Sequence, residues 1–213
     1  MTKKSLFLNT VYDRLFAVYG ECRCPLCHET PFQLLAAVML SAQCRDERVN
    51  LVTRELFALA PDAGAMAALP VEKISEIIHP LGLYAAKARN LHCAAQRIVE
   101  VYRGKVPQKM EDLVTLAGIG RKSANVVLGN AFEIPGFPVD THVNRVLNRL
   151  GAVSTDSPEA IEKIVDREVD PARWTNFSHL LIQHGRHVCN ARKPDCGACP
   201  LADLCLHNRR KNR

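Results

Sequence analysis

Four cysteines near the C-terminus constrain the fold of this chain more than any other feature. They follow the pattern Cys189-x6-Cys196-x2-Cys199-x5-Cys205, and two prolines and a glycine lie between them. Thiolates are soft ligands that suit zinc or an iron–sulfur cluster. So many thiols in so short a stretch predict a tight loop wrapped around a metal centre. The alternative, a secreted disulfide scaffold, needs an oxidising compartment and usually a small domain.

The rest of the sequence favours a reducing interior. The N-terminal segment MTKKSLFLNTVYDRLFAVYG has two lysines but neither a long apolar run nor a small-residue cleavage site, so we expect no secretory signal. No stretch approaches the roughly 18 consecutive apolar residues of a membrane-spanning helix. In such a chain, nine cysteines indicate thiols that are free or bound to metal. We therefore expect a cytoplasmic protein that has no contact with a membrane.

The size and charge of the chain set broad limits on its partners. Its 213 residues suffice for one or two domains with an apolar core. A formal net charge of +6 suits a polyanionic partner, although many basic proteins bind none. An iron–sulfur cluster of charge about −2 leaves a balance of about +4, so the basic bias survives.

The apolar pattern is helical throughout and predicts an all-α fold. Residues 84–102 carry one apolar stripe at three- and four-residue spacing, and residues 174–184 carry another that ends on His184. The almost wholly apolar run 31–40 predicts a buried central helix with Pro31 in its first turn. No run alternates polar and apolar β-branched residues, so we expect no sheet.

Two segments, 79–98 and 115–134, resemble each other. Both run Leu-x-Gly, a short gap, and then a lysine within a new helix. Each predicts a helix end, a tight turn that glycine permits, and a second helix start. The free amides at that start can hold a phosphate, although a purely structural turn is the alternative. In the second segment Gly118 and Gly120 are followed directly by Arg121 and Lys122, which adds two cations beside those amides.

Two residues near this turn have side chains suited to chemistry. Lys122 is predicted in the first turn of a helix, where the positive helix end and Arg121 disfavour an ammonium charge. A neutral amine can form a Schiff base with an electrophilic carbon, although most lysines are solvated surface charges. Asp140 precedes another predicted helix and can act as an ordinary N-cap. Held in that orientation, its carboxylate can also stabilise a developing cation.

The segments LAGIGRKSANVV and VDTH, followed by the cysteine pattern, resemble the endonuclease III family of helix-hairpin-helix DNA glycosylases. The likeness covers nearly the whole chain, and its three motifs occur in the family's order. It implies two helical lobes with a DNA-binding cleft between them. One lobe is a six-helix barrel over 24–134, with the helix-hairpin-helix at 113–131. The other is an iron–sulfur cluster domain built from 1–23 and 135–213, with the cluster loop at 189–205.

The resemblance also implies a function. Family members remove oxidised or ring-damaged pyrimidines from double-stranded DNA and cleave the strand at the abasic site. Carried over to this chain, Lys122 is the nucleophile and Asp140 the carboxylate that assists base departure. One 4Fe–4S cluster binds the four C-terminal cysteines. We expect a monomeric, nucleoid-associated bacterial enzyme.

The resemblance further assigns residues that contact DNA. Gln43 fills the gap left by a flipped nucleotide and Leu83 is an apolar wedge, whereas a buried polar residue and a core leucine are the alternatives. The hairpin around Gly118, Gly120 and Arg121 holds phosphate, and Arg192 and Lys193 on the cluster loop contact it. Two positions depart from the family pattern: Ala117 replaces a proline, and Cys44 replaces a small residue.

The resemblance assigns no role to one cysteine-rich segment, Cys22-Arg-Cys24-Pro-Leu-Cys27-His28. It formally satisfies the c-type haem attachment pattern, but attachment requires export. Its ligand types also suit a Cys3His zinc site, although the adjacent Cys27 and His28 bind one ion only awkwardly. A thiol-rich loop without a ligand is the simplest interpretation.

Three other functions remain open on sequence alone. The adenine glycosylase branch of the superfamily shares the cysteines and the aspartate, but lacks the lysine and carries a further C-terminal domain. This chain has Lys122 and ends eight residues after Cys205. A cluster-bearing electron carrier usually has tighter, paired cysteine spacings. A non-catalytic DNA-binding module needs neither Lys122 nor Asp140.

Overall fold

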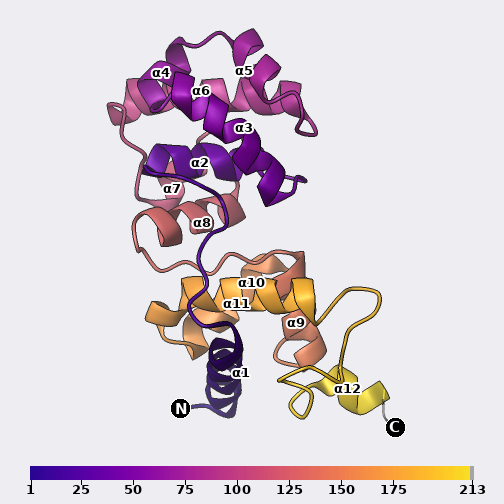
Figure 1. Cartoon of the computed structure of the whole chain (residues 1–213). Coiled ribbons are helices and arrows are strands. Elements are labelled where there is room, and N and C mark those ends of the chain that lie inside the picture. Colours follow the sequence, from indigo (N-terminus) through magenta and orange to yellow (C-terminus); the bar gives the residue numbers. More distant parts are fainter. Residues whose placement is uncertain (212–213) are drawn as a thin grey trace. The chain divides into compact units, whose positions relative to one another are not determined.

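The structure, a computed structural model, describes residues 1–211. Asn212 and Arg213, the end of the expected segment 135–213, lie outside the described residues. Within 1–211 the chain forms helices, turns and loops and no β-strand, so the all-α prediction is confirmed (Figure 1). No helix in this range has the length and apolar character that crossing a membrane requires.

The chain divides into two compact units, each with its own apolar core. Unit 1 comprises Met1–Arg23 and Pro135–Arg213, and unit 2 comprises Cys24–Ile134. Unit 2 contains seven helices: α2 (Pro31–Leu40), α3 (Asp46–Leu59), α4 (Ala63–Ala68), α5 (Val71–Ile77), α6 (Tyr84–Tyr102), α7 (Met110–Leu113) and α8 (Arg121–Ala131). Unit 1 contains α1 (Lys3–Tyr19), α9 (Thr141–Leu150), α10 (Pro158–Glu168), the 3-10 turn η1 (Pro171–Arg173), α11 (Trp174–His187) and α12 (Leu206–Lys211).

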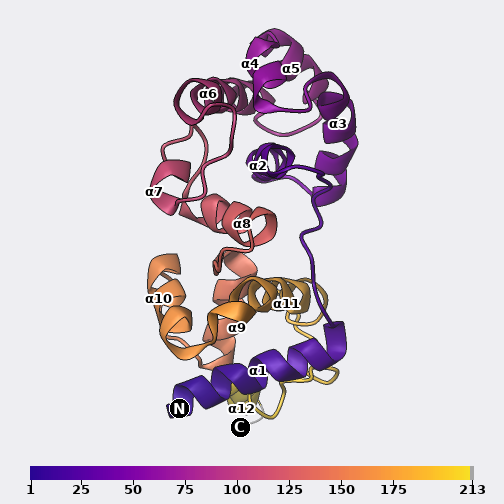
Figure 2. The ribbon, with the colours of Figure 1, turned by 90° about the vertical axis from the view of Figure 1, so that its left-hand side faces the viewer.

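Helix α2 is the centre of unit 2. Thr30 caps it and Pro31 opens it, as the sequence predicts, and every residue from Phe32 to Leu40 is buried. Helices α3, α6 and α8 pack around α2, and α4 and α5 pack against α6 (Figure 2). The predicted stripe of α6 faces this core through Leu91, Ala94, Ala95 and Ile98. This packing holds the starts of α6 and α8 in place.

The core of unit 1 lies between α1, α9 and α11. Helix α11 packs against both α9 and α1, with Phe177, Leu180 and Leu181 fully buried. Ser178, also on the inner face of α11, donates a hydrogen bond to the Pro138 carbonyl at 2.7 Å and thereby fixes the segment before α9. The cysteine loop follows α11 directly, and its residues Leu201 and Cys205 are buried in the same core.

Candidate active site and metal centre

The turn between α7 and α8 is a glycine hairpin whose second helix has an open N-terminus. Gly118 has φ +80°, a conformation that strains any L side chain, and an added Cβ would lie 3.1 Å from the Asn90 Cβ. Gly120 is the N-cap of α8, and no side chain caps this helix end. The first backbone N–H groups of α8 are therefore available to an anion.

Lys122 lies in the first turn of α8, and its side chain is exposed, as is that of Arg121. The charge of Lys122 also reaches Cys24 in the same unit. Burial raises the pKa of the Cys24 thiol, a backbone hydrogen bond with Leu26 opposes that rise, and the Lys122 charge opposes it further. The predicted position of Lys122 is confirmed, and its amine is accessible to a ligand held by the α8 N-terminus.

Asp140 is the N-cap of α9, and one of its two carboxylate oxygens makes both capping bonds. Its Oδ1 accepts from the backbone N–H groups of His142 at 2.8 Å and Val143 at 2.9 Å. Its Oδ2 has no partner among residues 1–211, and the side chain is only half-buried. The capping role is confirmed, and the second oxygen remains available. Asp140 belongs to unit 1 and Lys122 to unit 2.

Gln43 and Leu83 are exposed residues in a left-handed backbone conformation. Gln43 has φ 56° in the turn after α2, and Leu83 has φ 60° at the N-cap of α6. The Leu83 side chain is 63% exposed, so neither a buried glutamine nor a core leucine describes these positions. Non-glycine residues with positive φ are strained by about 1–3 kcal/mol and often mark functional sites.

Lys87 connects the turn that carries Gln43 to the helix that begins after Leu83. Its side chain is only 7% exposed, and its Nζ donates to the Ala42 carbonyl at 2.8 Å and lies 3.2 Å from the Cys44 Sγ. Its backbone N–H bonds to the Leu83 carbonyl at 3.0 Å. The burial of Lys87 could not be predicted from the sequence, because a lysine near a helix start has no pattern that indicates burial.

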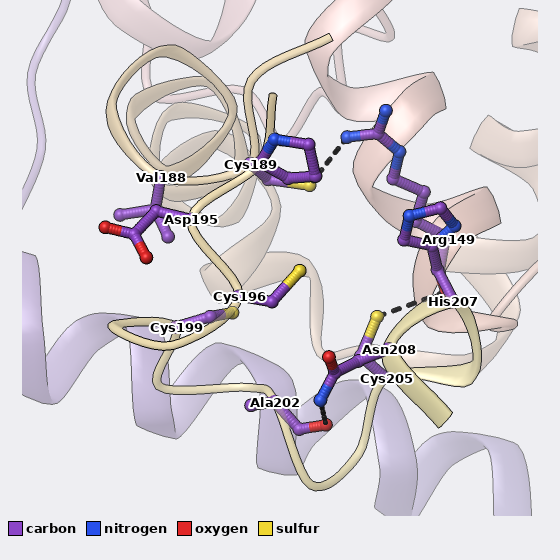
Figure 3. A pocket seen from close by; sticks show the side chains of 11 residues that line it. Arg149, Val188, Cys189, Asp195, Cys196, Cys199, Ala202, Cys205, His207 and Asn208 are labelled. Atoms are coloured by element: carbon purple, nitrogen blue, oxygen red, sulfur yellow. Dashed lines mark hydrogen bonds between the residues drawn. The ribbon is translucent and has the colours of Figure 1, made fainter. Parts of the chain in front are cut away.

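The four C-terminal cysteines line one hollow in unit 1 (Figure 3). It encloses about 290 Å³, including the part open to solvent, and its other lining residues include Arg149, Pro194 and His207. All nine cysteines of the chain are free thiols, so the structure gives no support to a disulfide scaffold. The prediction that the loop gathers its thiols around one space is confirmed.

Two arginines of α9 hold the start of this loop. Arg149 donates to the carbonyls of Asn190 at 2.8 Å and Ala191 at 2.7 Å, and its Nη1 lies 3.4 Å from the Cys189 Sγ. Arg145 donates to the Cys189 carbonyl at 3.1 Å. Figure 3 shows the Arg149 side chain directed toward Cys189. Arg192 and Lys193, farther along the loop, are exposed.

A histidine of α11 contacts the loop from another side. His184 is 1% exposed, and its two ring nitrogens lie 3.2 Å from the Tyr19 hydroxyl and 3.5 Å from the Cys199 Sγ. Burial lowers the pKa of His184 to about 4, so its imidazole is neutral at neutral pH. The apolar stripe ending on His184 predicts its burial, but sequence gives no indication of these two contacts.

The donor set fits a polynuclear cluster, because four thiols line one hollow. Within residues 1–211, no three His, Cys, Asp or Glu side chains stand close enough to bind one metal ion. A 4Fe–4S cluster places each cysteine on a different iron, so its ligands surround a space rather than a point. Four sulfurs lining one hollow match that requirement. The zinc alternative for Cys22, Cys24, Cys27 and His28 gains no support, and Cys22 and Cys24 instead pack against the cores of units 1 and 2.

Comparison with known protein families agrees with this arrangement. Residues 36–171 match the HhH-GPD superfamily of base excision DNA repair proteins, and residues 189–205 match the iron–sulfur binding domain of endonuclease III. The chain belongs to the endonuclease III family. One 4Fe–4S cluster is accordingly its cofactor, and the hollow lined by Cys189, Cys196, Cys199 and Cys205 lies within the matched segment.

Individual endonuclease III proteins are similar over most of their length. The enzyme of Synechocystis sp. is 50% identical over 88% of this chain and 86% of its own. That of Escherichia coli K12 is 42% identical over 83% of each. Two solved structures, a non-covalent endonuclease III–DNA complex and a trapped endonuclease III–DNA covalent intermediate, each superpose with a TM-score of 0.93 and 38% identity over 100% of both chains.

Proposed function

We propose that this chain is a bifunctional DNA glycosylase and AP lyase of base excision repair that uses Lys122 as its nucleophile. The observation that carries the proposal is the exposed Lys122 amine in the first turn of α8, beside a helix end that no side chain caps. Membership of the endonuclease III family over most of the chain supplies the reaction class. The substrate is double-stranded DNA that contains an oxidised or ring-damaged pyrimidine or an abasic site.

The reaction proceeds through a covalent enzyme–DNA intermediate. The Lys122 amine attacks C1′ of the damaged nucleotide, and the C1′–N bond to the base breaks, with the electron pair leaving on the base. The sugar ring then opens: the C1′–O4′ bond breaks, O4′ takes a proton, and the nitrogen that has lost its protons forms the C=N bond of a Schiff base, which makes the C2′ proton acidic. Loss of this proton eliminates the 3′ phosphate and cleaves the strand. A trapped covalent intermediate of a similar endonuclease III agrees with this chemistry.

Asp140 assists departure of the base. Its Oδ1 is committed to the two capping bonds, which fix the plane of the carboxylate. Its Oδ2 is therefore the atom that stabilises positive charge developing on the sugar and orients the proton transfers. A preoriented carboxylate needs little reorganisation during the reaction, which favours the transition state.

DNA binding rests on amides, cations and two projecting side chains. The open end of α8 and Arg121 bind a backbone phosphate, and the absence of side chains at Gly118 and Gly120 lets it approach. Gln43 and Leu83, both exposed and both at positive φ, occupy the space that the flipped nucleotide leaves. Arg192 and Lys193 contact phosphate from the cluster loop.

The two units correspond to the two lobes of the enzyme. Unit 2, with its seven helices, corresponds to the lobe that the resemblance describes as a six-helix barrel, and it contains the helix-hairpin-helix. Unit 1 is the iron–sulfur domain. The four cysteines would hold the cluster with one thiolate on each iron, which would leave no open coordination site for hydrolytic chemistry, so the cluster would supply structural support. The enzyme acts as a monomer on the bacterial nucleoid in the cytoplasm.

The decisive experiment traps the Schiff base. Mixing the protein with duplex DNA that contains an abasic site, and adding borohydride, should give a covalent protein–DNA adduct. Lys122→Ala should lose the adduct, whereas Lys105→Ala, a change at another exposed lysine of unit 2, should keep it. Removal of a damaged base by the wild type without any adduct would contradict the lyase function and favour a monofunctional glycosylase instead.

A further inference from the structure

His184 joins the end of α1 to one cysteine of the metal site. Its ring lies between the Tyr19 hydroxyl, at 3.2 Å from Nδ1, and the Cys199 Sγ, at 3.5 Å from Nε2. The Tyr19 and His184 rings meet edge-on, with centroids 6.2 Å apart. The ring has no other polar partner among residues 1–211, so these two contacts account for its hydrogen bonding.

Binding of iron fixes the direction of both hydrogen bonds. An iron-bound thiolate has no proton, so the Cys199 sulfur can only accept, and the His184 Nε2 must carry the donated hydrogen. In a neutral imidazole Nδ1 is then bare and accepts from the Tyr19 O–H. Burial and the negative charge of Cys199 raise the pKa of Tyr19, so this phenol keeps its proton. The result is a one-directional chain from Tyr19 through His184 to Cys199.

We infer that His184, oriented by Tyr19, is a positioning residue for the 4Fe–4S cluster and raises the reduction potential of the cluster through its hydrogen bond to Cys199. A donor directed at a ligand sulfur stabilises the extra negative charge of the reduced state more than it stabilises the oxidised state. The effect is strong here because the bond lies in a buried, weakly screened environment. The orienting bond from Tyr19 strengthens the Nε2–H donor in turn.

Arg149 provides a second donor, on Cys189, but it cannot serve as a clean test. Its guanidinium also holds the Asn190 and Ala191 carbonyls, so its loss would disturb the loop as well as the sulfur. Within residues 1–211, the His184 ring nitrogens make only the two polar contacts with Tyr19 and Cys199. Substitutions at His184 and Tyr19 therefore change the hydrogen bond to sulfur with the least change elsewhere.

The experiment compares reduction potentials of cluster-loaded variants by optical redox titration, with iron content confirming four irons per chain. We expect His184→Phe to lower the potential so that, at a fixed applied potential, the ratio of reduced to oxidised protein falls about tenfold, or about 59 mV for one electron. His184→Gln, which retains an N–H donor, should recover most of this shift. Tyr19→Phe should give a smaller shift of the same sign. The matched control is His187→Phe on the same helix, where the exposed ring contacts Gln183 instead of a cysteine.

Two results would overturn the inference. One is a wild-type potential in fully loaded His184→Phe. The other is an equal shift in His184→Phe and His184→Gln, because ring volume rather than the donor would then set the potential. If His184→Phe does not assemble the cluster, the Tyr19→Phe variant tests the inference instead, through its reduction potential and its proton coupling. In that variant we expect a changed coupling of the exchangeable proton to the paramagnetic cluster by electron–nuclear double resonance. An unchanged coupling together with an unchanged potential would refute the chain of hydrogen bonds.

Discussion

At the scale of single residues, the two carboxylate oxygens of Asp140 have different roles: Oδ1 caps a helix, and Oδ2 takes part in the proposed chemistry. Because Oδ1 makes both capping bonds, Asp140→Asn keeps an oxygen for the cap but loses the charge. We expect its free energy of unfolding to stay within about 0.5 kcal/mol of wild type, while base excision slows about 100-fold or more. Asp140→Ala should lose the cap as well, at about 1 kcal/mol. Urea unfolding and single-turnover excision measure the two effects, and an equal stability loss in both variants would show that the charge itself holds the helix.

Lys87 looks like an ordinary surface lysine in the sequence, but its side chain is buried and bonds to the turn that carries Gln43. Replacing its buried ammonium with Met removes a desolvated charge, so the loss of the bonds to Ala42 and Cys44 is largely offset in stability. We expect Lys87→Met to change the free energy of unfolding by less than about 1 kcal/mol. The turn carrying Gln43 loses its anchor, however, and a hydrogen bond to a charged group contributes about 1.5–3 kcal/mol. Affinity for abasic duplex DNA should therefore fall about tenfold or more.

Fluorescence anisotropy measures this affinity, and Lys73→Met is the matched control. Lys73 is an exposed lysine of unit 2 that pairs with Glu76 on its own helix. Loss of one surface charge there should leave binding close to wild type. Wild-type affinity in Lys87→Met would show that the turn around Gln43 does not depend on this lysine.

At the scale of helices, the features that the sequence predicts are those that depend on residues close together in the chain. Helix α2, the bounds of α6 and the cap of α9 follow from periodicity, proline position and capping chemistry, which involve residues only a few positions apart. The positive φ of Leu83 could not be foreseen, because leucine has no preference for that conformation. The contact between Tyr19 and His184 joins residues 165 positions apart, and only packing of α1 against α11 creates it.

The two hairpin glycines of the α7–α8 turn are two residues apart, but we expect alanine substitutions at them to have different effects on stability and on DNA binding. Gly118→Ala meets both a positive φ and Asn90 at 3.1 Å, so we expect a loss of about 1–3 kcal/mol in the free energy of unfolding. Gly120 has φ −99° and open space at its Cβ position, so Gly120→Ala should fold with stability within about 1 kcal/mol of wild type. Its methyl group should still obstruct a phosphate at the α8 amides and lower DNA affinity about tenfold, or about 1.4 kcal/mol. Unaltered binding by Gly120→Ala would argue against a phosphate there.

At the scale of the whole molecule, each unit has its own apolar core, but only unit 1 contains the cluster ligands. The stretch 189–205 contains no helix, and its sulfurs and the Arg149 contacts tie it to α9 and α11. Because metal binding free energy contributes to folding, stripping the cluster from the intact protein should destabilise unit 1 selectively. We expect amide hydrogen exchange in 189–205 and in α9 to accelerate about 100-fold, equivalent to about 2.8 kcal/mol. The buried helix α2 of unit 2 should keep its protection. Equal acceleration in α2 would show that the two cores unfold as one cooperative structure, and that the cluster stabilises the barrel as much as its own domain.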